Sequence, residues 1–496
     1  MNKPATDWHA AASALRIDGR AFIGGQRVAT ASGETFAKTS PIDGRMLGDI
    51  ARGRNEDVDT AVASARAAFA DARWAGKAPA ARKKVLQRFA EKILAARDEL
   101  ALLETLDMGK PIQYSLAVDV GATARTIAWY AEAVDKIYDE IAPTAASALA
   151  LITREPMGVI GVVVPWNYPM QIIGRSVGAA LAMGNACVLK PAEEACLTAL
   201  AIGRIAQQCG LPAGALNIVP GLGEEAGAAL TAHAGVQHLS FTGSVATGRL
   251  VQAAAAKHTV PVTLELGGKS PQIVFADADL DAALPFLVNA GIQNAGQTCS
   301  AGSRILVERS RFDEVVERLA QRVRALKVGP ALADLDLGPL ISKRQHEIVS
   351  HYLGLARDAG LSIAAQGEIV DSAPAGGFYV RPTLVAAVPA AHALAQEEIF
   401  GPVQVVIAFD DEADALRIAN GTPYGLVAGV WTRDGSRALR MARALRCGQV
   451  FINNYGAGGG VELPFGGVGA SGHGREKGFE ALYGFSALKT VAILHG

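Results

Sequence analysis

Short apolar runs and amphipathic segments alternate through the middle of the chain. The run Gly-Val-Ile-Gly-Val-Val-Val at 158–164 is rich in β-branched residues, which is typical of a parallel strand covered on both faces. Further strands are expected at 186–189, 216–219 and 238–241, and helices at 172–183, 196–209, 224–231 and 245–257. This alternation predicts a doubly wound α/β domain, a fold that commonly binds a dinucleotide.

A strand is expected at 262–266, and after it the same alternation begins again and predicts a second α/β domain. Its expected strands are 272–275 and 304–307, and its expected helices are 281–294 and 312–326.

Helical spacing of apolar residues also precedes the first domain. It predicts helices at 57–72, 80–104 and 113–137. A link over 141–150 then leads to an expected strand at 151–154. The weak alternation at 485–494 predicts an edge strand that is available to another subunit.

Length and charge narrow the class of protein. A chain of 496 residues exceeds the size at which one core stops growing, so two or three domains are expected. Lys and Arg (47) nearly balance Asp and Glu (48), which disfavours a nucleic acid or an acidic membrane surface as partner and favours a small molecule.

Residues 1–19 lack an apolar run, so no secretory signal is expected. The least charged window, 156–174, holds prolines and polar residues, so it predicts a buried strand and turn rather than a membrane span.

The number and spacing of the cysteines indicate the redox environment of the protein, and one of them is a candidate nucleophile. They number five and form no C-x-x-C pair, which argues against a disulfide framework or structural zinc and fits a reducing cytoplasm. One of them, Cys299, stands in Gly-Gln-Thr-Cys-Ser-Ala-Gly, where small neighbours would leave its sulfur reachable. A lone cysteine is more often a small core residue, but a core strand or helix would carry larger apolar neighbours. Cys299 is therefore a candidate nucleophile, provided that its surroundings favour the thiolate.

Two glycine-rich turns follow strands of the first domain. Gly243-Ser244-Val245-Ala246-Thr247-Gly248 lies between a strand and a helix, where backbone N–H groups can hold a pyrophosphate. It lacks the Lys of a P-loop, and the glycines at 221, 223 and 227 miss the dinucleotide fingerprint by one residue. Each turn by itself is also compatible with a purely structural role.

Polar residues at other strand ends are further candidates. Lys190 and Glu193 end a strand and open a helix, at the edge where α/β sheets bind ligands, although a solvated salt bridge explains them equally. Glu265 lies between two leucines, a poorly solvated position that raises a carboxyl pKa and suits a general base. Its structural alternative is an N-cap or a buried ion pair with Lys269. The turn 165–169 carries Asn167, whose amide could donate to an oxyanion.

The acidic stretch 277–281 resembles the start of a calcium loop. It lacks the glycine and the glutamate that such a loop requires, so helix capping is the better interpretation and no metal site is expected.

Taken together, these segments resemble the aldehyde dehydrogenase superfamily, from about Phe22 to the C-terminus. The motifs that carry the resemblance are Pro165-Trp166-Asn167-Tyr168-Pro169, Lys190-Pro191-Ala192-Glu193, Phe241-Thr242-Gly243-Ser244, Glu265-Leu266-Gly267-Gly268-Lys269, Gly296-Gln297-Thr298-Cys299, Glu398-Ile399-Phe400-Gly401-Pro402 and Pro464-Phe465-Gly466-Gly467. Their joint occurrence in this order makes the resemblance specific.

The resemblance implies the roles of three residues. Cys299 would attack the aldehyde carbon, and the Asn167 side chain with the Cys299 backbone N–H would stabilise the oxyanion. Glu265 would then deprotonate the water that hydrolyses the thioester to a carboxylic acid. Rival interpretations are a CoA-acylating enzyme of the same superfamily, which often lacks the base, and a non-catalytic binding or structural protein.

The resemblance also implies an NAD site. It would place Lys190 and Glu193 at the adenine ribose, and Glu193 would repel the 2′-phosphate of NADP, which makes NADP the less favoured cofactor. The full set of expected cofactor contacts is Val164, Pro165, Trp166, Lys190, Glu193, Gly223, Gly227, Phe241, Thr242, Gly243, Ser244, Leu266, Gly267, Glu398 and Phe400.

The implied architecture consists of two doubly wound α/β domains and a β arm. The expected parts are an NAD-binding domain (1–135 and 155–264), a catalytic domain (265–472) and an oligomerisation arm (136–154 and 473–496). A cytoplasmic homodimer or homotetramer with an aldehyde as its small-molecule substrate is expected, without nucleic acid or membrane as a partner.

The substrate is left open by the sequence. Arg175 lies where succinate semialdehyde dehydrogenases carry a carboxylate-binding arginine, but the second arginine of such a clamp is replaced by Gln293. An ion pair at the tunnel wall is the alternative role for Arg175. The glycine-rich loop 454–460 would border the substrate entrance and either admits a bulky aldehyde or is simply mobile.

Overall fold

The apolar run at 158–164 becomes β7 (Val159–Val164), the central strand of an eight-stranded sheet. The computed structural model describes residues 6–456 and 460–496. The order of this sheet is β2-β1-β9-β8-β7-β10-β11-β21, and β9, β8, β7, β10 and β11 are parallel. The other strands of the sheet are β1 (Ala21–Ile23), β2 (Gln26–Val28), β8 (Ala186–Pro191), β9 (Leu216–Ile218), β10 (His238–Thr242), β11 (Val262–Glu265) and β21 (Gly472–His473).

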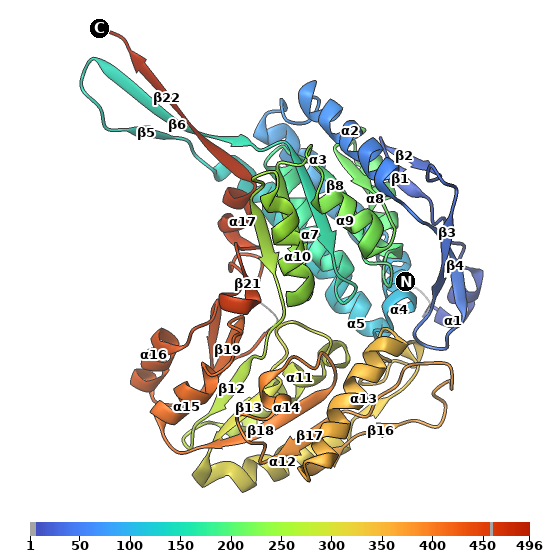
Figure 1. Cartoon of the computed structure of the whole chain (residues 1–496), viewed down its shortest axis with the longest axis vertical. Coiled ribbons are helices and arrows are strands. Elements are labelled where there is room, and N and C mark those ends of the chain that lie inside the picture. Colours follow the sequence, from blue (N-terminus) through green and yellow to red (C-terminus); the bar gives the residue numbers. More distant parts are fainter. Residues whose placement is uncertain (1–5, 457–459) are drawn as a thin grey trace, which may run out of the picture.

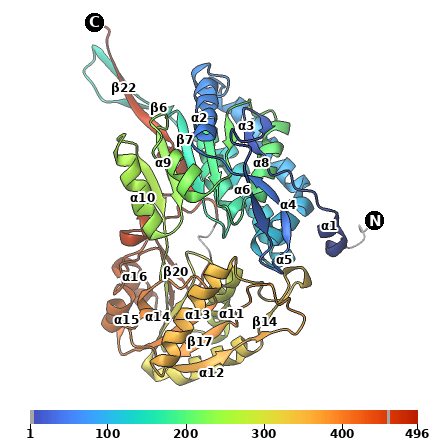
Figure 2. The same ribbon diagram turned by 45° about the vertical axis from the view of Figure 1, so that its right-hand side comes forward.

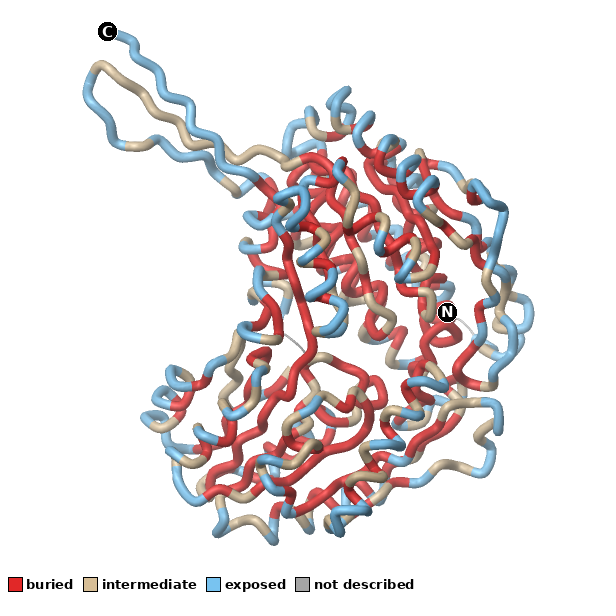
Figure 3. The backbone as a smooth tube through the Cα atoms, in the orientation of Figure 1, coloured by how far each residue is buried: buried red, intermediate tan, exposed pale blue. Residues whose placement is uncertain are grey.

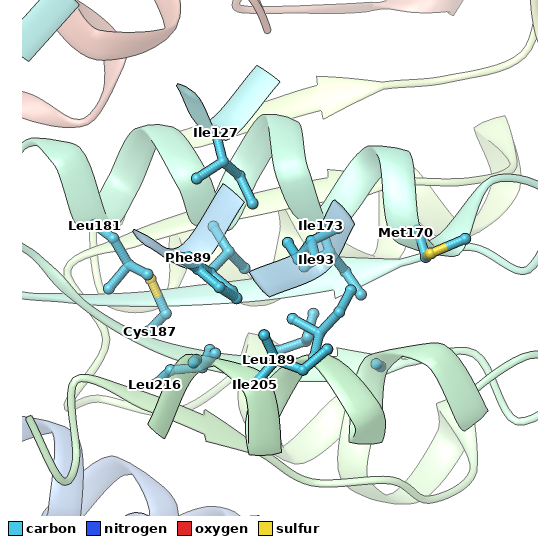
Figure 4. Close-up of a cluster of buried hydrophobic side chains, with 14 of the residues drawn as sticks. Phe89, Ile93, Ile127, Met170, Ile173, Leu181, Cys187, Leu189, Ile205 and Leu216 are labelled. Carbon is cyan, nitrogen blue, oxygen red and sulfur yellow. The ribbon is translucent and has the colours of Figure 1, made fainter. Parts of the chain in front are cut away.

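Alternating side chains of β7 face two layers of helices. Ile160 and Val162 belong to a core with helices α3, α6 and α7, whereas Val159 and Val163 pack with α2, α9 and α10 on the other face. Figure 4 shows the first of these cores, where side chains of the helices pack around Leu189 of β8. The helices of the two layers are α2 (Asn55–Ala70), α3 (Pro79–Ala95), α4 (Arg97–Met108), α6 (Val120–Ala133), α7 (Pro169–Ala182), α8 (Leu197–Gln208), α9 (Ala228–Thr231) and α10 (Val245–Ala256). The predicted doubly wound α/β domain is therefore confirmed.

The single helix predicted at 80–104 is wrong. The structure divides it at Ala96, whose φ and ψ of −92° and 19° leave the helical region, into α3 and α4. The bend directs α4 towards α8, where every residue from Leu100 to Met108 is buried. A helix buried on all sides loses the one-sided apolar pattern on which the prediction relied.

The second sheet has seven strands in the order β15-β17-β18-β13-β12-β19-β20. Asp279 caps helix α11 by accepting a hydrogen bond from Ala282 N at 3.2 Å, so the helix-capping interpretation is confirmed. The strands are β12 (Pro271–Val274), β13 (Arg304–Glu308), β15 (Ser362–Gln366), β17 (Thr383–Ala386), β18 (Val403–Phe409), β19 (Val427–Trp431) and β20 (Gln449–Ile452). The helices around them include α11 (Leu280–Ile292), α12 (Phe312–Arg324), α13 (Lys343–Asp358), α15 (Glu412–Ala419) and α16 (Gly435–Ala444).

A three-stranded sheet projects from the rest of the molecule as an arm (Figures 1 and 2). It consists of β5 (Glu140–Ala142), β6 (Ala148–Pro156) and β22 (Ser486–Leu494), with β6 in the middle. The strands expected at 151–154 and 485–494 are present, but the expected link at 141–150 is wrong in part, because it contains most of β5 and the start of β6. The arm is largely exposed, in contrast to the buried strands of the two large sheets (Figure 3).

Shorter elements complete the chain. They are α1 (Trp8–Ala14), β3 (Thr35–Thr39), β4 (Met46–Ala51), α5 (Ile112–Tyr114), η1 (Ser115–Asp119), η2 (Val134–Lys136), η3 (Gly223–Gly227), η4 (Gln293–Gly296), η5 (Arg309–Arg311), β14 (Lys327–Val328), η6 (Ala331–Ala333), β16 (Glu368–Ile369), α14 (Ala393–Gln396), η7 (Gly469–Ser471) and α17 (Gly478–Gly484). Among the residues that the structure describes, no helix is both long enough and apolar enough to cross a membrane.

Candidate active site

A cavity of about 670 Å³ lies between the two large sheets. It is lined by the turn after β7, the turn after β10, the end of β11 and the segment that carries Cys299. The carboxyl ends of parallel strands meet at one edge of a sheet, which is why residues far apart in the sequence gather here. The cavity brings together the three proposed catalytic residues Asn167, Glu265 and Cys299.

The backbone before Cys299 has an unusual conformation. Asn294 and Ala295 both have a φ of +53°, and Gly296 follows with a φ of +73°. A Cβ at Gly296 would lie 2.2 Å from Gly401 O, so only glycine fits there. This turn ends α11 and directs the half-buried Cys299 into the cavity.

Asn167 forms hydrogen bonds that connect the turn after β7 to the segment that carries Cys299. Its Nδ2 donates to Gln297 O at 3.0 Å, and Asn294 Nδ2 donates to Asn167 O at 3.0 Å. The Asn167 side chain therefore lies beside the reactive segment, as the resemblance implied.

Burial controls the ionisation of the thiol. It raises the pKa of Cys299 to about 12, the positive charge of Arg175 opposes this increase, and the carboxylates Glu398, Glu265 and Glu476 add to it. The thiol is therefore mostly protonated at neutral pH in the cofactor-free protein.

Glu265 ends β11 and is only 2 % exposed. Neither of its oxygens has a hydrogen-bond partner among the described residues, so the ion pair with Lys269 considered from the sequence is absent there. Burial raises the pKa of Glu265 well above its usual value, and Glu476 adds to the increase, while Arg475 and Arg175 oppose it. The poorly solvated position inferred from the two flanking leucines is confirmed.

Eight of the fifteen expected cofactor contacts line the cavity. These are Pro165, Trp166, Thr242, Gly243, Ser244, Gly267, Glu398 and Phe400. The rings of Trp166 and Phe400 meet edge to face at 5.3 Å. Glu398 accepts a hydrogen bond from Gly268 N at 2.9 Å, and burial raises its pKa to about 7.

The remaining expected contacts lie outside the cavity lining. Lys190 Nζ donates to Glu193 Oε2 at 2.7 Å, and Gly223 N donates to the other oxygen of Glu193 at 3.4 Å. Gly227 lies against the Lys190 side chain. Burial raises the pKa of Glu193, but Lys190 outweighs it and holds the pKa below its usual value. Three further expected contacts, Val164, Phe241 and Leu266, are buried side chains of the core.

Two glycines of the site allow neighbouring side chains to pack directly against the backbone. A Cβ at Gly243 would lie 2.6 Å from the Phe241 ring, and a Cβ at Gly267 would lie 2.0 Å from Glu398 Oε2. Gly243 also precedes the N-terminus of the twelve-residue helix α10, which Ser244 caps by accepting a hydrogen bond from Thr247 N at 3.2 Å. The N-terminus of a helix that follows a strand of a parallel sheet suits a pyrophosphate, so the turn at Gly243 and Ser244 fits a dinucleotide.

The structure adds residues that the sequence analysis missed. Besides Arg175, the cavity is lined by Arg125, Tyr168, Gln171, Phe465, Glu476 and Lys477. The signal that could have revealed two of them is the charged triplet Arg475-Glu476-Lys477 between Gly474 and Gly478. Charged residues between glycines that pack closely against other backbone are rarely solvated, which is a reason to expect a function for them.

Arg175 forms an ion pair at the cavity wall. Its Nη1 lies 3.8 Å from Glu476 Oε2, and its guanidinium lies over the Phe465 ring at 5.4 Å. The ion-pair alternative considered for Arg175 is therefore present. The glycine-rich loop 454–460 is expected from the sequence to border the substrate entrance. Its residues 457–459 lie outside the described part of the chain, so this expectation stays a prediction.

Comparison with known proteins identifies the family. Residues 28–491 match the model of the aldehyde dehydrogenase family. The chain is 43 % identical over 489 residues to the NADP/NAD-dependent aldehyde dehydrogenase PuuC of Escherichia coli K12, covering 98 % of each chain. It is also 43 % identical over 491 residues to aminoacetaldehyde dehydrogenase of Pseudomonas aeruginosa, again covering 98 % of each chain.

A solved structure gives the same result. The chain superimposes on indole-3-acetaldehyde dehydrogenase in complex with NAD⁺ with a TM-score of 0.96 and 45 % identity, covering 98 % of this chain and 99 % of the other. A similarity of this extent covers both large sheets, the cavity between them and the arm. The chain belongs to the aldehyde dehydrogenase family.

Proposed function

We propose that the protein oxidises an aldehyde to the carboxylic acid, with NAD as the oxidant and Cys299 as the nucleophile. The observation that carries the proposal is the cavity in which a thiol, an amide donor and an unpartnered carboxylate meet. One covalent nucleophile, one oxyanion donor and one base are the groups that this reaction needs.

Each of the three residues has one task. Cys299 Sγ, as thiolate, forms a bond to the carbonyl carbon, and the oxyanion accepts hydrogen bonds from Asn167 Nδ2 and the Cys299 N–H. Bound NAD supplies the hydride acceptor of the oxidation. Glu265 then takes a proton from the water that attacks the thioester, and the acid leaves as Cys299 regains its thiol.

We propose NAD rather than NADP as the preferred cofactor. Gly243 and Ser244 with Trp166 would hold the pyrophosphate, and Glu398 with Phe400 would lie near the nicotinamide ribose. Lys190 and Glu193, joined at 2.7 Å, would contact the adenine ribose. The carboxylate of Glu193 accepts from ribose hydroxyls and repels a 2′-phosphate, which is the basis of the preference.

We propose that the chain divides into three functional parts. The first sheet and its helices support an NAD-binding domain over 1–135 and 155–264, and the second sheet supports a catalytic domain over 265–472. The third sheet supports an oligomerisation arm over 136–154 and 473–496, which would join a homodimer or homotetramer. All five cysteines are free thiols, which supports a location in the reducing cytoplasm.

The test of the reaction is NADH formation by the purified protein, measured by absorbance with NAD and without CoA. Succinate semialdehyde and benzaldehyde provide an acidic and an aromatic substrate side by side. Turnover without CoA, lost in Cys299→Ala, is the expected result. Turnover that requires CoA would replace this proposal with acyl transfer to CoA, because Glu265 would then not act as the base for water.

A further inference from the structure

Two buried carboxylates adjoin the reactive segment of the cavity. Neither oxygen of Glu265 and only one oxygen of Glu476 has a hydrogen-bond partner among the described residues. The partnered oxygen of Glu476 accepts from Thr242 Oγ1 at 3.4 Å. Buried carboxylates of this kind are costly unless a cation compensates them.

Arg175 is placed to supply that cation. Arg175 lies in the second turn of α7, eight residues after Asn167, and its side chain is 12 % exposed. Its guanidinium is 3.8 Å from Glu476 and over the ring of Phe465, and it donates no hydrogen bond within the described residues. Because a guanidinium remains charged throughout the working range of proteins, its charge does not depend on pH.

The charge of Arg175 interacts electrostatically with titratable groups on several different elements. The titratable groups that interact with it are Asp119 of η1, Tyr130 of α6, Glu265 of β11, Cys299, Glu476 and Lys477, and Arg475 acts on Glu265 beside it. For both Cys299 and Glu476, burial raises the pKa and Arg175 is the strongest effect that opposes it. Burial and Arg175 together lower the pKa of Lys477 to about 7, so Lys477 is a weaker source of charge at neutral pH.

We propose that Arg175 is a positioning residue, whose permanent charge holds Glu476 near Glu265 and favours the thiolate of Cys299, and that it does not bind a substrate carboxylate. This inference rests on the function proposed above. A substrate carboxylate at Arg175 would compete with Glu476 for the guanidinium and would leave that buried carboxylate without its cation.

Alkylation of Cys299 by iodoacetamide tests this proposal without cofactor or turnover. The rate would be measured from pH 6 to 10 in the wild type, Arg175→Lys and Arg175→Met, with Cys299→Ala giving the contribution of other cysteines. For each unit by which the thiol pKa rises, the thiolate fraction at pH 8 falls about tenfold, and the greater nucleophilicity of a more basic thiolate recovers part of this. We therefore expect alkylation of Arg175→Met to be about three- to tenfold slower at pH 8, with Arg175→Lys close to the wild type.

Arg125→Met is the matched control. Arg125 also lines the cavity and is exposed, but it is not among the main influences on the pKa of Cys299 or of Glu265. Its removal takes away the same charge and is expected to leave the alkylation profile unchanged. An equal slowing in both variants would show a general charge effect and would overturn the assignment to Arg175.

Steady-state kinetics separate positioning from substrate binding. If Arg175 is a positioning residue, Arg175→Met lowers kcat by a similar factor with succinate semialdehyde and benzaldehyde. A rise in KM for succinate semialdehyde alone, with unchanged alkylation, would instead make Arg175 a carboxylate-binding residue and overturn the proposal. Absence of turnover by the wild type would contradict the proposed function, while the alkylation rates would still decide the role of Arg175.

Discussion

Both reactive side chains of the cavity are held in their neutral forms by burial. The pKa of Cys299 is raised to about 12 and that of Glu265 well above 4.5, because each side chain loses the water that would stabilise its charge. Each must lose a proton before it can act. Activity is therefore expected to increase as the pH rises towards the pKa of each group.

Glu265→Gln should separate the two halves of the reaction. The glutamine keeps the size of the side chain but cannot take a proton, so hydrolysis of the thioester should slow by roughly 10²- to 10⁴-fold. The first turnover of NADH, which precedes hydrolysis, should persist as a burst in stopped-flow absorbance. In the wild type the hydrolytic rate should rise with pH through the elevated pKa of Glu265 and then level off, and this ascending limb should vanish in the variant. Equal loss of burst and steady-state rate would contradict this role.

Asn167→Ala should slow turnover without unfolding the protein. Loss of one oxyanion donor typically costs about 10²- to 10³-fold in kcat. The variant also loses the hydrogen bond from Asn167 Nδ2 to Gln297 O, which helps to join the turn after β7 to the Cys299 segment. Steady-state kinetics and a melting temperature measured together check the prediction. Near wild-type turnover in a folded variant would remove Asn167 from the mechanism.

The sequence reveals catalytic residues that lie in distinctive local surroundings. The small neighbours of Cys299 and the leucines beside Glu265 are visible in the chain, and the structure places both residues in one cavity. Glu476 carries only the weaker signal of its charged triplet, because its importance comes from Arg175, which lies 301 positions earlier in the chain. Contacts between distant segments depend on the packing of the two sheets, which single-sequence patterns do not contain.

At the scale of elements, a buried ionic cluster joins α4, η1 and α7. Lys110 Nζ lies 3.0 Å from both Glu104 Oε1 and Asp119 Oδ1 and 4.0 Å from the centre of the Tyr168 ring. Gln171 of α7 donates to the same Asp119 oxygen at 2.7 Å and also lines the cavity. The cluster therefore supports one wall of the active site from behind.

Lys110→Met should destabilise the protein strongly. It leaves two buried carboxylates without their cation, a change that typically costs about 3–5 kcal/mol. The expected result is a lower melting temperature by differential scanning fluorimetry. The triple variant Glu104→Gln, Asp119→Asn and Lys110→Met removes the charges together and should recover most of the loss. If the triple variant melts as low as the single one, unpaired charge is not the cause.

The prediction of elements succeeds where burial alternates along the chain. The strands and helices between 158 and 257 are found because each strand is apolar and each helix follows a glycine or polar turn. It fails at α3 and α4, where burial on all sides of α4 hides the break at Ala96. The sequence analysis predicts no helix or strand between 327 and 484. Strands such as β14, β16 and β21 in this region have only two residues, which is too short for any periodicity.

At the scale of the whole molecule, the arm presents an apolar edge. Among the described residues, β22 pairs with β6 through the register Ser486↔Pro156 to Leu494↔Ala148, and its other edge is unpaired. Leu488 and Leu494, which lie on one face of β22, are 61 % and 81 % exposed. Unpaired strand edges with exposed apolar side chains favour association with another copy.

If the arm joins subunits as proposed, Glu substitution at Leu488 and Leu494 should lower the mass of the protein in solution. Buried charge without a partner opposes association, while the body of the subunit is not altered. Light scattering coupled to size-exclusion chromatography measures the mass. Leu94→Glu on α3, a leucine that is 50 % exposed on the body, is the matched control and should keep the wild-type mass. An unchanged mass in the arm variant would show that β22 does not join subunits.

The last strand of the eight-stranded sheet comes from the end of the chain. β21 pairs with β11 through Leu264↔His473 and Glu265↔Gly472, and Glu476 follows a few residues later. During synthesis, the N-terminal strands leave the ribosome first and can begin to fold, but the strand that flanks Glu265 is made only after all seven strands of the second sheet. The nascent chain therefore carries a nearly finished eight-stranded sheet before Glu476 is made, so Cys299 acquires this part of its charged surroundings late in synthesis.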